Sequence, residues 1–257
     1  MRKRKSSTRR LPKKAIPVLI VSGLILLILT FIVGSALLKR YTPTKDRMEL
    51  TEYYGITDES QVAITLNNTV LDNYAISMND SIYLDYHFVH DILNSRFYWD
   101  SNENILLYTT ASNIISAKSD STTYSIGKTT TDFDRTIVKA NADSAWIDLE
   151  FVKMYSDFTY TTYENPSRIV ITNAWEEITT AKVKKKTEVR EKGGIKSLIL
   201  SEISKNDTVT ILEQDEKWTK VCTQDGITGY VRSKYVNNTQ NTTPVNELFP
   251  KNLPISS

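Results

Sequence analysis

Two aspartates and two histidines are the first candidates for chemistry in this sequence. Asp85 and Asp148 occupy equivalent positions in two similar stretches of the chain, and a pair of carboxylates can carry out acid–base catalysis. His87 and His90 lie three residues apart on a predicted helix, a spacing that could place both imidazoles on one face. A zinc site would need further ligands, for which Asp85 and Asp91 are the near candidates. Because each repeated aspartate precedes a predicted helix, we interpret both as N-terminal caps and the histidines as surface residues.

Cys222 and a short acidic motif are weaker candidates for catalysis. A nucleophilic cysteine needs a partner histidine, and no histidine follows Cys222 in the chain. Its place in an alternating strand predicts a small packed residue instead. Asp132 and Asp134 resemble part of the Asp-x-x-Asp-x-Asp-x-Glu strand of family 18 glycoside hydrolases, but Thr129 and Thr136 replace two of its acids. We therefore predict no catalytic residue in this chain.

The composition argues against metal and nucleotide chemistry. One cysteine in 257 residues excludes an intrachain disulfide and a four-thiolate zinc site. The eight glycines form no G-x-G-x-x-G, and Thr122 stands where a phosphate-binding loop ending at Gly127 needs a glycine. We predict no cofactor, no metal and no nucleotide.

Aromatic side chains are better candidates for binding. Trp218, Tyr230 and Tyr235 could form a stacking surface for a sugar or a peptide stem. A small barrel also needs aromatic residues in its core, so core packing of Trp218 and Tyr230 remains the alternative. Tyr98 and Trp99 are neighbours in a predicted strand, where alternation would place one inside and the other outside.

The N-terminal region predicts a membrane anchor. Residues 15–38 carry no charge, and 24 helical residues would span about 36 Å, enough for a hydrocarbon layer of about 30 Å. This stretch is longer than the apolar part of a cleaved signal, which is the alternative. Residues 1–14 contain eight basic and no acidic side chains, so we predict that this tail is cytoplasmic and that residues 41–257 lie outside the plasma membrane. The rest of the chain has 24 basic against 30 acidic residues, which argues against nucleic-acid binding.

An internal repeat follows a predicted linker at 39–60. Residues 80–89 match residues 143–152 at an offset of 63, and the similarity continues into later apolar stretches. Each copy predicts a strand, a capped helix and further strands. Two such units sharing one core predict an α+β domain over 61–175. The pattern from Val62 to Tyr108 resembles the copper amine oxidase N-terminal-like domain, which does not carry the copper site and whose resemblance implies a wall-proximal spacer or binding module.

A second small domain is predicted at 180–236. Alternating runs at 187–190, 195–200, 208–212, 218–223 and 228–231 predict about five strands, and Asp225-Gly226 predicts a tight turn. So many strands in 57 residues predict a small closed, all-β barrel. The set T-x-V-R, K-N-D-x-V-T-I-L, K-W-T-K-V and D-G-x-T-G-Y-V is similar to bacterial SH3-like (SH3b) domains, which implies docking onto peptidoglycan or another envelope polymer. Residues 237–257 have the composition of a flexible tail.

Together these features predict a single-pass, non-catalytic protein of a bacterial envelope. An exported chain without a disulfide suits a Gram-positive surface. Its expected partners are the lipid bilayer and peptidoglycan or another envelope glycan. In one alternative, the chain is the N-terminal targeting region of an exported family 18 glycoside hydrolase, whose order of modules it resembles and whose catalytic domain would follow residue 257. In another, it is a sensor or adaptor that uses its short cytoplasmic tail.

Overall fold

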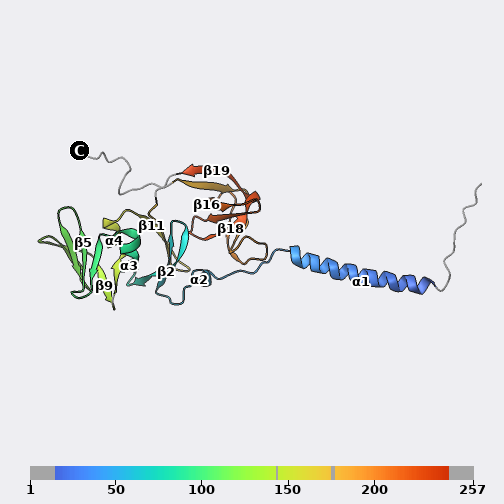
Figure 1. Ribbon diagram of the computed structural model, residues 1–257, viewed down its shortest axis with the longest axis horizontal. Coiled ribbons are helices and arrows are strands. Elements are labelled where there is room, and N and C mark those ends of the chain that lie inside the picture. Colours follow the sequence, from blue (N-terminus) through green and yellow to red (C-terminus); the bar gives the residue numbers. More distant parts are fainter. Residues whose placement is uncertain (1–14, 143, 175–176, 243–257) are drawn as a thin grey trace, which may run out of the picture. The chain divides into compact units, whose positions relative to one another are not determined.

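The computed structural model describes residues 15–142, 144–174 and 177–242, which form two compact units, Met1–Thr44 and Lys45–Ser257 (Figure 1). The predicted basic tail at 1–14 and the end of the predicted flexible tail, 243–257, lie outside the described residues.

The first unit contains one long helix, α1 (Ala15–Tyr41). Its Val21–Tyr41 part has a mean hydropathy of 2.6 and is long and apolar enough to cross a membrane. The hydroxyl groups of Thr30 and Ser35 donate to the carbonyls of Leu27 and Ile32, at 2.9 and 2.8 Å, so these polar groups find partners within the helix. The helix is compatible with the predicted membrane anchor.

The first part of the second unit, which we call the repeat lobe (residues 61–172), contains a seven-stranded sheet. The strand order is β11 (Thr159–Tyr163), β12 (Arg168–Thr172), β1 (Gln61–Leu66), β2 (Thr69–Met78), β3 (Ser81–Asp85), β10 (Ser144–Asp148) and β9 (Val138–Asn141). Only β1 and β12 pair in parallel within this sheet.

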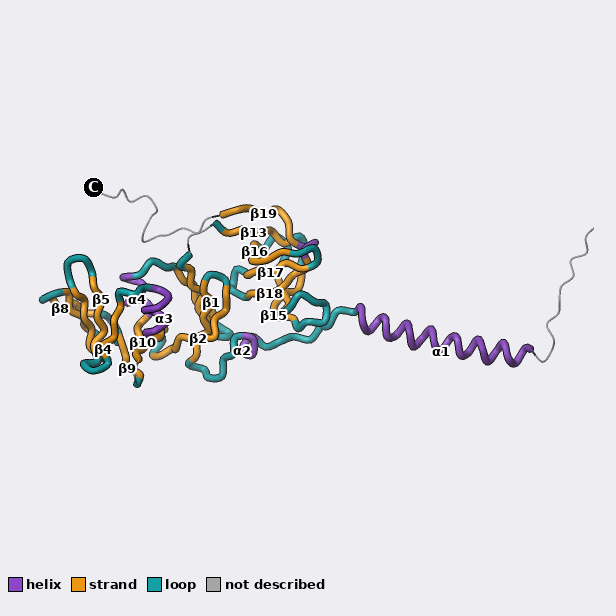
Figure 2. The backbone as a smooth tube through the Cα atoms, viewed as in Figure 1, coloured by secondary structure: helices purple, strands orange, loops and turns teal. Residues whose placement is uncertain are grey.

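A five-stranded antiparallel meander completes the repeat lobe. It consists of β4 (Phe97–Asp100), β5 (Ile105–Thr109), β6 (Ile114–Lys118), β7 (Thr123–Ile126) and β8 (Thr129–Asp132). The helices of the repeat lobe are α3 (Tyr86–Phe88), the π-helix η1 (Val89–Leu93) and α4 (Leu149–Tyr155). The helices end early because Asn94 and Ser156 have extended backbones. The lobe is mostly β, as Figure 2 shows, and the predicted α+β fold of the amine-oxidase-like type is not confirmed.

The internal repeat is present in the strand register as well as in the sequence. Cross-strand partners in the first copy have counterparts 63 residues later: Ile76 and Tyr83 correspond to Lys139 and Trp146, and Phe97 and Tyr108 correspond to Tyr160 and Ile171. Each copy therefore contributes a hairpin, a short helix and a second hairpin. The two copies have the same local topology.

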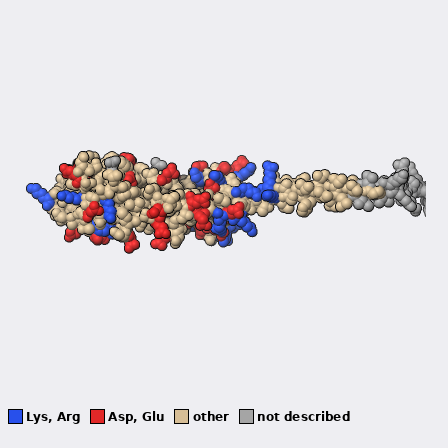
Figure 3. All heavy atoms as spheres, turned by 90° about the horizontal axis from the view of Figure 1, so that it is seen from below, with Lys and Arg blue, Asp and Glu red and all other residues tan. Residues whose placement is uncertain are grey.

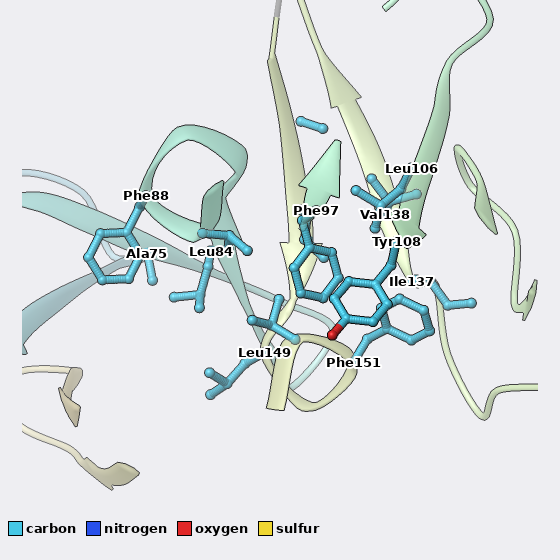
Figure 4. Close-up of a cluster of buried hydrophobic side chains, with 14 of the residues drawn as sticks. Ala75, Leu84, Phe88, Phe97, Leu106, Tyr108, Ile137, Val138, Leu149 and Phe151 are labelled. Atoms are coloured by element: carbon cyan, nitrogen blue, oxygen red, sulfur yellow. The ribbon is translucent and has the colours of Figure 1, made fainter. Parts of the chain in front are cut away.

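Both copies bury their apolar side chains in one core, as predicted. Figure 4 shows Phe97 and Tyr108 from one copy beside Phe151 from the other, and the ring centroids of Phe97 and Tyr108 are 4.7 Å apart. Alternation in β4 leaves Tyr98 55% exposed and Trp99 6% exposed, which confirms that only one of the two faces inward.

The second part of this unit, which we call the C-terminal lobe (residues 178–242), contains one antiparallel sheet of seven strands. Their order is β15 (Ile199–Ile203), β14 (Thr187–Arg190), β18 (Thr228–Arg232), β17 (Trp218–Cys222), β16 (Thr208–Gln214), β13 (Ile178–Val183) and β19 (Val236–Thr242). A 3-10 helix, η2 (Ser233–Tyr235), precedes β19.

Three features of the C-terminal lobe differ from the prediction. The strand predicted at 195–200 begins at Ile199, because residues 191–198 form a loop whose carbonyls bind the side chain of Arg190. The sheet has seven strands where about five were predicted, since β13 and β19 extend it. Residues 237–242, predicted to belong to a flexible tail, are part of strand β19, which pairs with β13.

The predicted linker at 39–60 includes helical residues and contacts the C-terminal lobe. Helix α1 continues to Tyr41, and a short helix, α2 (Leu50–Tyr53), follows. The backbone of Asp46 and Met48 pairs with Ile199 on the edge of β15, at 2.9 and 3.0 Å. The side chains of Met48, Leu50 and Tyr53 pack against the core of the C-terminal lobe. We call residues 46–54 the strap, because they connect the start of the second unit to the C-terminal lobe through these backbone and side-chain contacts.

Candidate functional site

The outer face of the β17–β18 pair carries an aromatic and cationic surface. Trp218 lies opposite Arg232, and Lys220 lies opposite Tyr230. Their neighbours in the strands, Thr219, Val221 and Val231, are buried. Because side chains alternate along a strand, Trp218, Lys220, Tyr230 and Arg232 point to the opposite face, where they are partly exposed. The guanidinium carbon of Arg232 is 5.3 Å from the Trp218 ring centroid. We call these four residues the aromatic face.

Local hydrogen bonds and a loop position Trp218. Asp215 Oδ1 accepts from the backbone N–H groups of Trp218 and Lys217, both at 2.7 Å. These two bonds, the Trp218 one first, hold the pKa of the Asp215 carboxyl below its usual range. On the other side, a Cβ atom added to Gly193 would lie 3.3 Å from Trp218 Cγ. The backbone of the 191–198 loop therefore borders the indole closely.

Buried Arg190 fixes that loop. Its guanidinium donates to the carbonyl oxygens of Ser197 and Ile195, at 2.6 and 3.3 Å, and pairs with the carboxylate of Glu188. Arg190 lies opposite Tyr230 in the sheet. Sequence reasoning missed this role, and only the T-x-V-R pattern marks the position. Arg190 is committed to positioning the loop beside the aromatic face.

Tyr235 is in a different setting from the two aromatic residues grouped with it in the prediction. It belongs to η2, and the ammonium nitrogens of Lys185 and Lys234 lie 4.3 and 5.1 Å from its ring centroid. A hydrogen bond from Lys185, together with the charges of both lysines, lowers the pKa of its phenol. The structure thus places Trp218 and Tyr230 on one sheet face and Tyr235 among lysines.

The repeated aspartates are caps, as predicted. Asp85 Oδ1 accepts from the backbone N–H of His87 at 2.8 Å, and Asp148 Oδ1 accepts from that of Phe151 at 3.0 Å. Asp148 is only 1% exposed and also accepts from Arg135 Nε at 2.9 Å. Burial raises the pKa of Asp148 in spite of these bonds. Nothing near Asp148 in the sequence indicated its pairing with Arg135.

The remaining candidates have structural surroundings. His87 is exposed, whereas His90 Nδ1 lies 2.7 Å from the carbonyl oxygen of Phe97. Within the described ranges, no three His, Cys, Asp or Glu side chains gather as a metal site would require. Asp132 lies in the edge strand β8, and Asp134 pairs with Arg135 at 3.0 Å.

Cys222 is 3% exposed and packs inside the C-terminal lobe, in agreement with its predicted role. Its Sγ atom lies 3.6 Å from the carbonyl oxygen of Thr223. Burial raises the pKa of its thiol to about 11, which disfavours the nucleophilic thiolate.

Comparison with known proteins identifies the lobe that carries the aromatic face. No curated protein matches this chain. The resemblances of residues 61–175 to the amine-oxidase-like domain and of the whole order to family 18 glycoside hydrolases stay predictions. The predicted similarity of the C-terminal lobe to bacterial SH3-like domains is confirmed, since residues 185–237 match the family model of the bacterial SH3 domain.

Proposed function

We propose that this protein is a membrane-anchored envelope protein that holds peptidoglycan with the aromatic face of its C-terminal lobe. The match of residues 185–237 to the bacterial SH3 domain supports cell-wall binding, and the single apolar helix is compatible with an anchor. In this proposal the N-terminus is cytoplasmic, the second unit lies outside the membrane, and the chain as given is not an enzyme.

The observation that carries the proposal is the side-chain chemistry of the aromatic face. Aromatic rings stack on the C–H groups of sugars and on extended peptides. Arg232 and Lys220 flank the two rings and can donate to the carboxylates of a peptide stem. Because Asp215 and the 191–198 loop hold Trp218 in place, the surface is largely formed before a ligand arrives.

Sedimentation with purified peptidoglycan tests this proposal. The full chain in phosphatidylcholine nanodiscs should co-sediment with the polymer. A truncated central aromatic residue commonly costs 2 kcal/mol or more, so Trp218→Ala should weaken retention at least about tenfold. Tyr98→Ala is the matched control, because Tyr98 is an exposed aromatic residue of the repeat lobe.

Two outcomes would overturn the proposal in different ways. Failure of the unchanged chain to sediment would refute peptidoglycan binding. Equal retention of Trp218→Ala, in a protein whose thermal unfolding is unaltered, would move the binding surface elsewhere. Arg232→Gln offers a second test of the same face, because the substitution removes the charge over the indole and keeps a polar, hydrogen-bonding side chain.

A further inference from the structure

Two exposed lysines, Lys185 and Lys234, contact Tyr235 with their side chains, and a third, Lys184, precedes Lys185 and contacts Tyr235 through its backbone; we call these three residues the lysine cluster. The backbone N–H of Lys184 donates to the carbonyl of Tyr235 at 2.8 Å, which places the end of β13 beside η2. Lys185 and Lys234 lie over the Tyr235 ring. Residues from two segments about 50 positions apart in the chain are thus assembled at one place.

The cluster has no acidic counterpart. Among the described residues, no carboxylate lies within 4.0 Å of a nitrogen of these three lysines. Acids close to the cluster in the chain or in the sheet have other partners: Glu202 pairs with Lys186 at 2.5 Å and with Arg47, and Glu188 pairs with Arg190. Asp207, whose backbone carbonyl accepts from the N–H of Val183 at 3.0 Å, accepts from the backbone N–H of Ser204 with its carboxylate at 2.7 Å. The positive charges of the cluster therefore remain available to a partner.

A general excess of basic residues does not explain this arrangement. Outside residues 1–14, acids outnumber bases by 30 to 24. Figure 3 shows basic and acidic side chains unevenly spread over the face it presents. Like charges held close together destabilise the folded state, so an uncompensated group within a mildly acidic chain points to an anionic ligand.

The surroundings of the cluster favour a polymer over a lipid surface. Proteins that lie on a membrane usually insert large apolar side chains beside their basic ones. None of the exposed large hydrophobic side chains found in the described residues belongs to the C-terminal lobe. Ammonium groups are common ligands of phosphate, which they bind as point charges, and the Tyr235 hydroxyl adds a hydrogen-bonding group.

We propose that the lysine cluster binds consecutive phosphodiester groups of an anionic envelope polymer. This inference relies on the proposed location outside the membrane and is independent of the peptidoglycan contact at the aromatic face. The protein would then hold two chemically different polymers, one through stacking and one through charge.

Titration with a synthetic poly(glycerol phosphate) of defined length tests the inference. The full chain in phosphatidylcholine nanodiscs is compared with a variant carrying Lys184→Gln, Lys185→Gln and Lys234→Gln. We expect the variant to bind at least about tenfold more weakly and its log–log salt dependence to fall by about two to three. The matched control replaces Lys118, Lys128 and Lys139 of the repeat lobe with Gln, removes the same charge and should change affinity less than about twofold.

Several results would overturn the inference. Equal weakening by the cluster variant and the control would show a diffuse charge effect. Equally tight binding of poly-glutamate would remove the preference for phosphate, and cluster-dependent binding of separate phosphatidylglycerol vesicles would assign the site to lipid. The cluster variant should unfold at an unchanged or higher temperature and should still sediment with peptidoglycan. If it does not fold, the single changes Lys184→Gln and Lys234→Gln are tested, each with an expected loss of about two- to threefold.

Discussion

Arg168 links the two lobes of the second unit, and its replacement by alanine should lower the stability of both. Although only 4% exposed, its guanidinium reaches across to the C-terminal lobe, where Nε donates to the carbonyl of Asp225 at 3.1 Å. Within its own lobe, Nη1 donates to the carbonyls of Glu164 and Pro166, both at 3.2 Å. The Tyr163 ring centroid lies 4.8 Å from the guanidinium carbon. Arg168 is therefore a buried cation bound mainly by carbonyl oxygens.

The expected magnitude follows from what Arg168→Ala would leave behind. Hydrogen bonds from a charged donor contribute about 1.5–3 kcal/mol each, but those of one side chain are not additive. The change would leave the carbonyl oxygens of Glu164, Pro166 and Asp225 without this donor, and each acceptor left unsatisfied in a buried site costs about 1–3 kcal/mol, so the total should reach about 3 kcal/mol. We expect a loss of that size in the free energy of unfolding, a large part of the 5–15 kcal/mol that stabilises an ordinary domain.

Hydrogen exchange measured by mass spectrometry on the full chain in nanodiscs can locate this loss. Arg168→Ala should speed exchange in β12 and also in the 223–228 turn, although the turn lies more than 50 residues away in the chain. The control is Arg96→Ala, whose side chain is exposed in the repeat lobe and which should change stability by no more than about 0.5 kcal/mol.

Gly226→Ala approaches the same contact from the opposite lobe. Gly226 has φ +78°, and a Cβ atom would lie 2.3 Å from Val170 Cγ2. This change should therefore reproduce the exchange pattern of Arg168→Ala, whereas Gly194→Ala meets nothing within 4 Å and should not. If Arg168→Ala left exchange in the 223–228 turn unchanged, the reasoning that Arg168 couples the lobes would be refuted.

Three further predictions concern the two capping aspartates and the buried cysteine. Asp85→Ala should cost about 1 kcal/mol in urea unfolding, as the loss of a cap does, while Asp148→Ala should cost about 2–3 kcal/mol because Asp148 also binds Arg135; equal costs would contradict this difference. Cys222 in the folded chain should react with iodoacetamide at pH 8 at least about 100-fold more slowly than in guanidinium, because a thiol with a pKa of about 11 is almost fully protonated there. Since this pKa is raised above the unfolded value, the stability that the protonated thiol contributes should be complete below about pH 8.5 and lost as the pH rises toward about 11.

The elements that the sequence predicted well are those determined by neighbouring residues. The alternating pattern predicted the ends of β14, β16, β17 and β18 to within two residues, and the Asp225-Gly226 pair predicted the turn between β17 and β18. The 63-residue offset predicted a duplicated unit with one core because each copy repeats the same apolar positions. The caps at Asp85 and Asp148 followed from strand-to-helix junctions that are visible locally.

Contacts between distant segments could not be predicted in this way. The strap has the composition of a polar linker, yet Tyr53 donates to the carbonyl of Thr228 at 2.6 Å, 175 residues later. Likewise, nothing near Arg168 in the sequence indicates that it will donate to the carbonyl of Asp225, 57 residues later. The sequence predicted which aromatic residues could belong to the candidate site, but not how they are grouped. Only the fold shows that Tyr235 lies apart from Trp218 and Tyr230, because that grouping depends on contacts between distant segments.

The need for the strap follows from the small size of the C-terminal lobe. A domain of about 60 residues buries a smaller fraction of its surface than a larger one and is marginally stable. The lobe here adds Met48, Leu50 and Tyr53 to its core and pairs residues 46–48 with the edge of β15, which would otherwise offer free backbone groups. The 185–237 segment that matches the bacterial SH3 domain is therefore smaller than the unit that folds. The strap begins five residues after α1 ends, so the segment that follows the apolar helix in the chain also stabilises the C-terminal lobe.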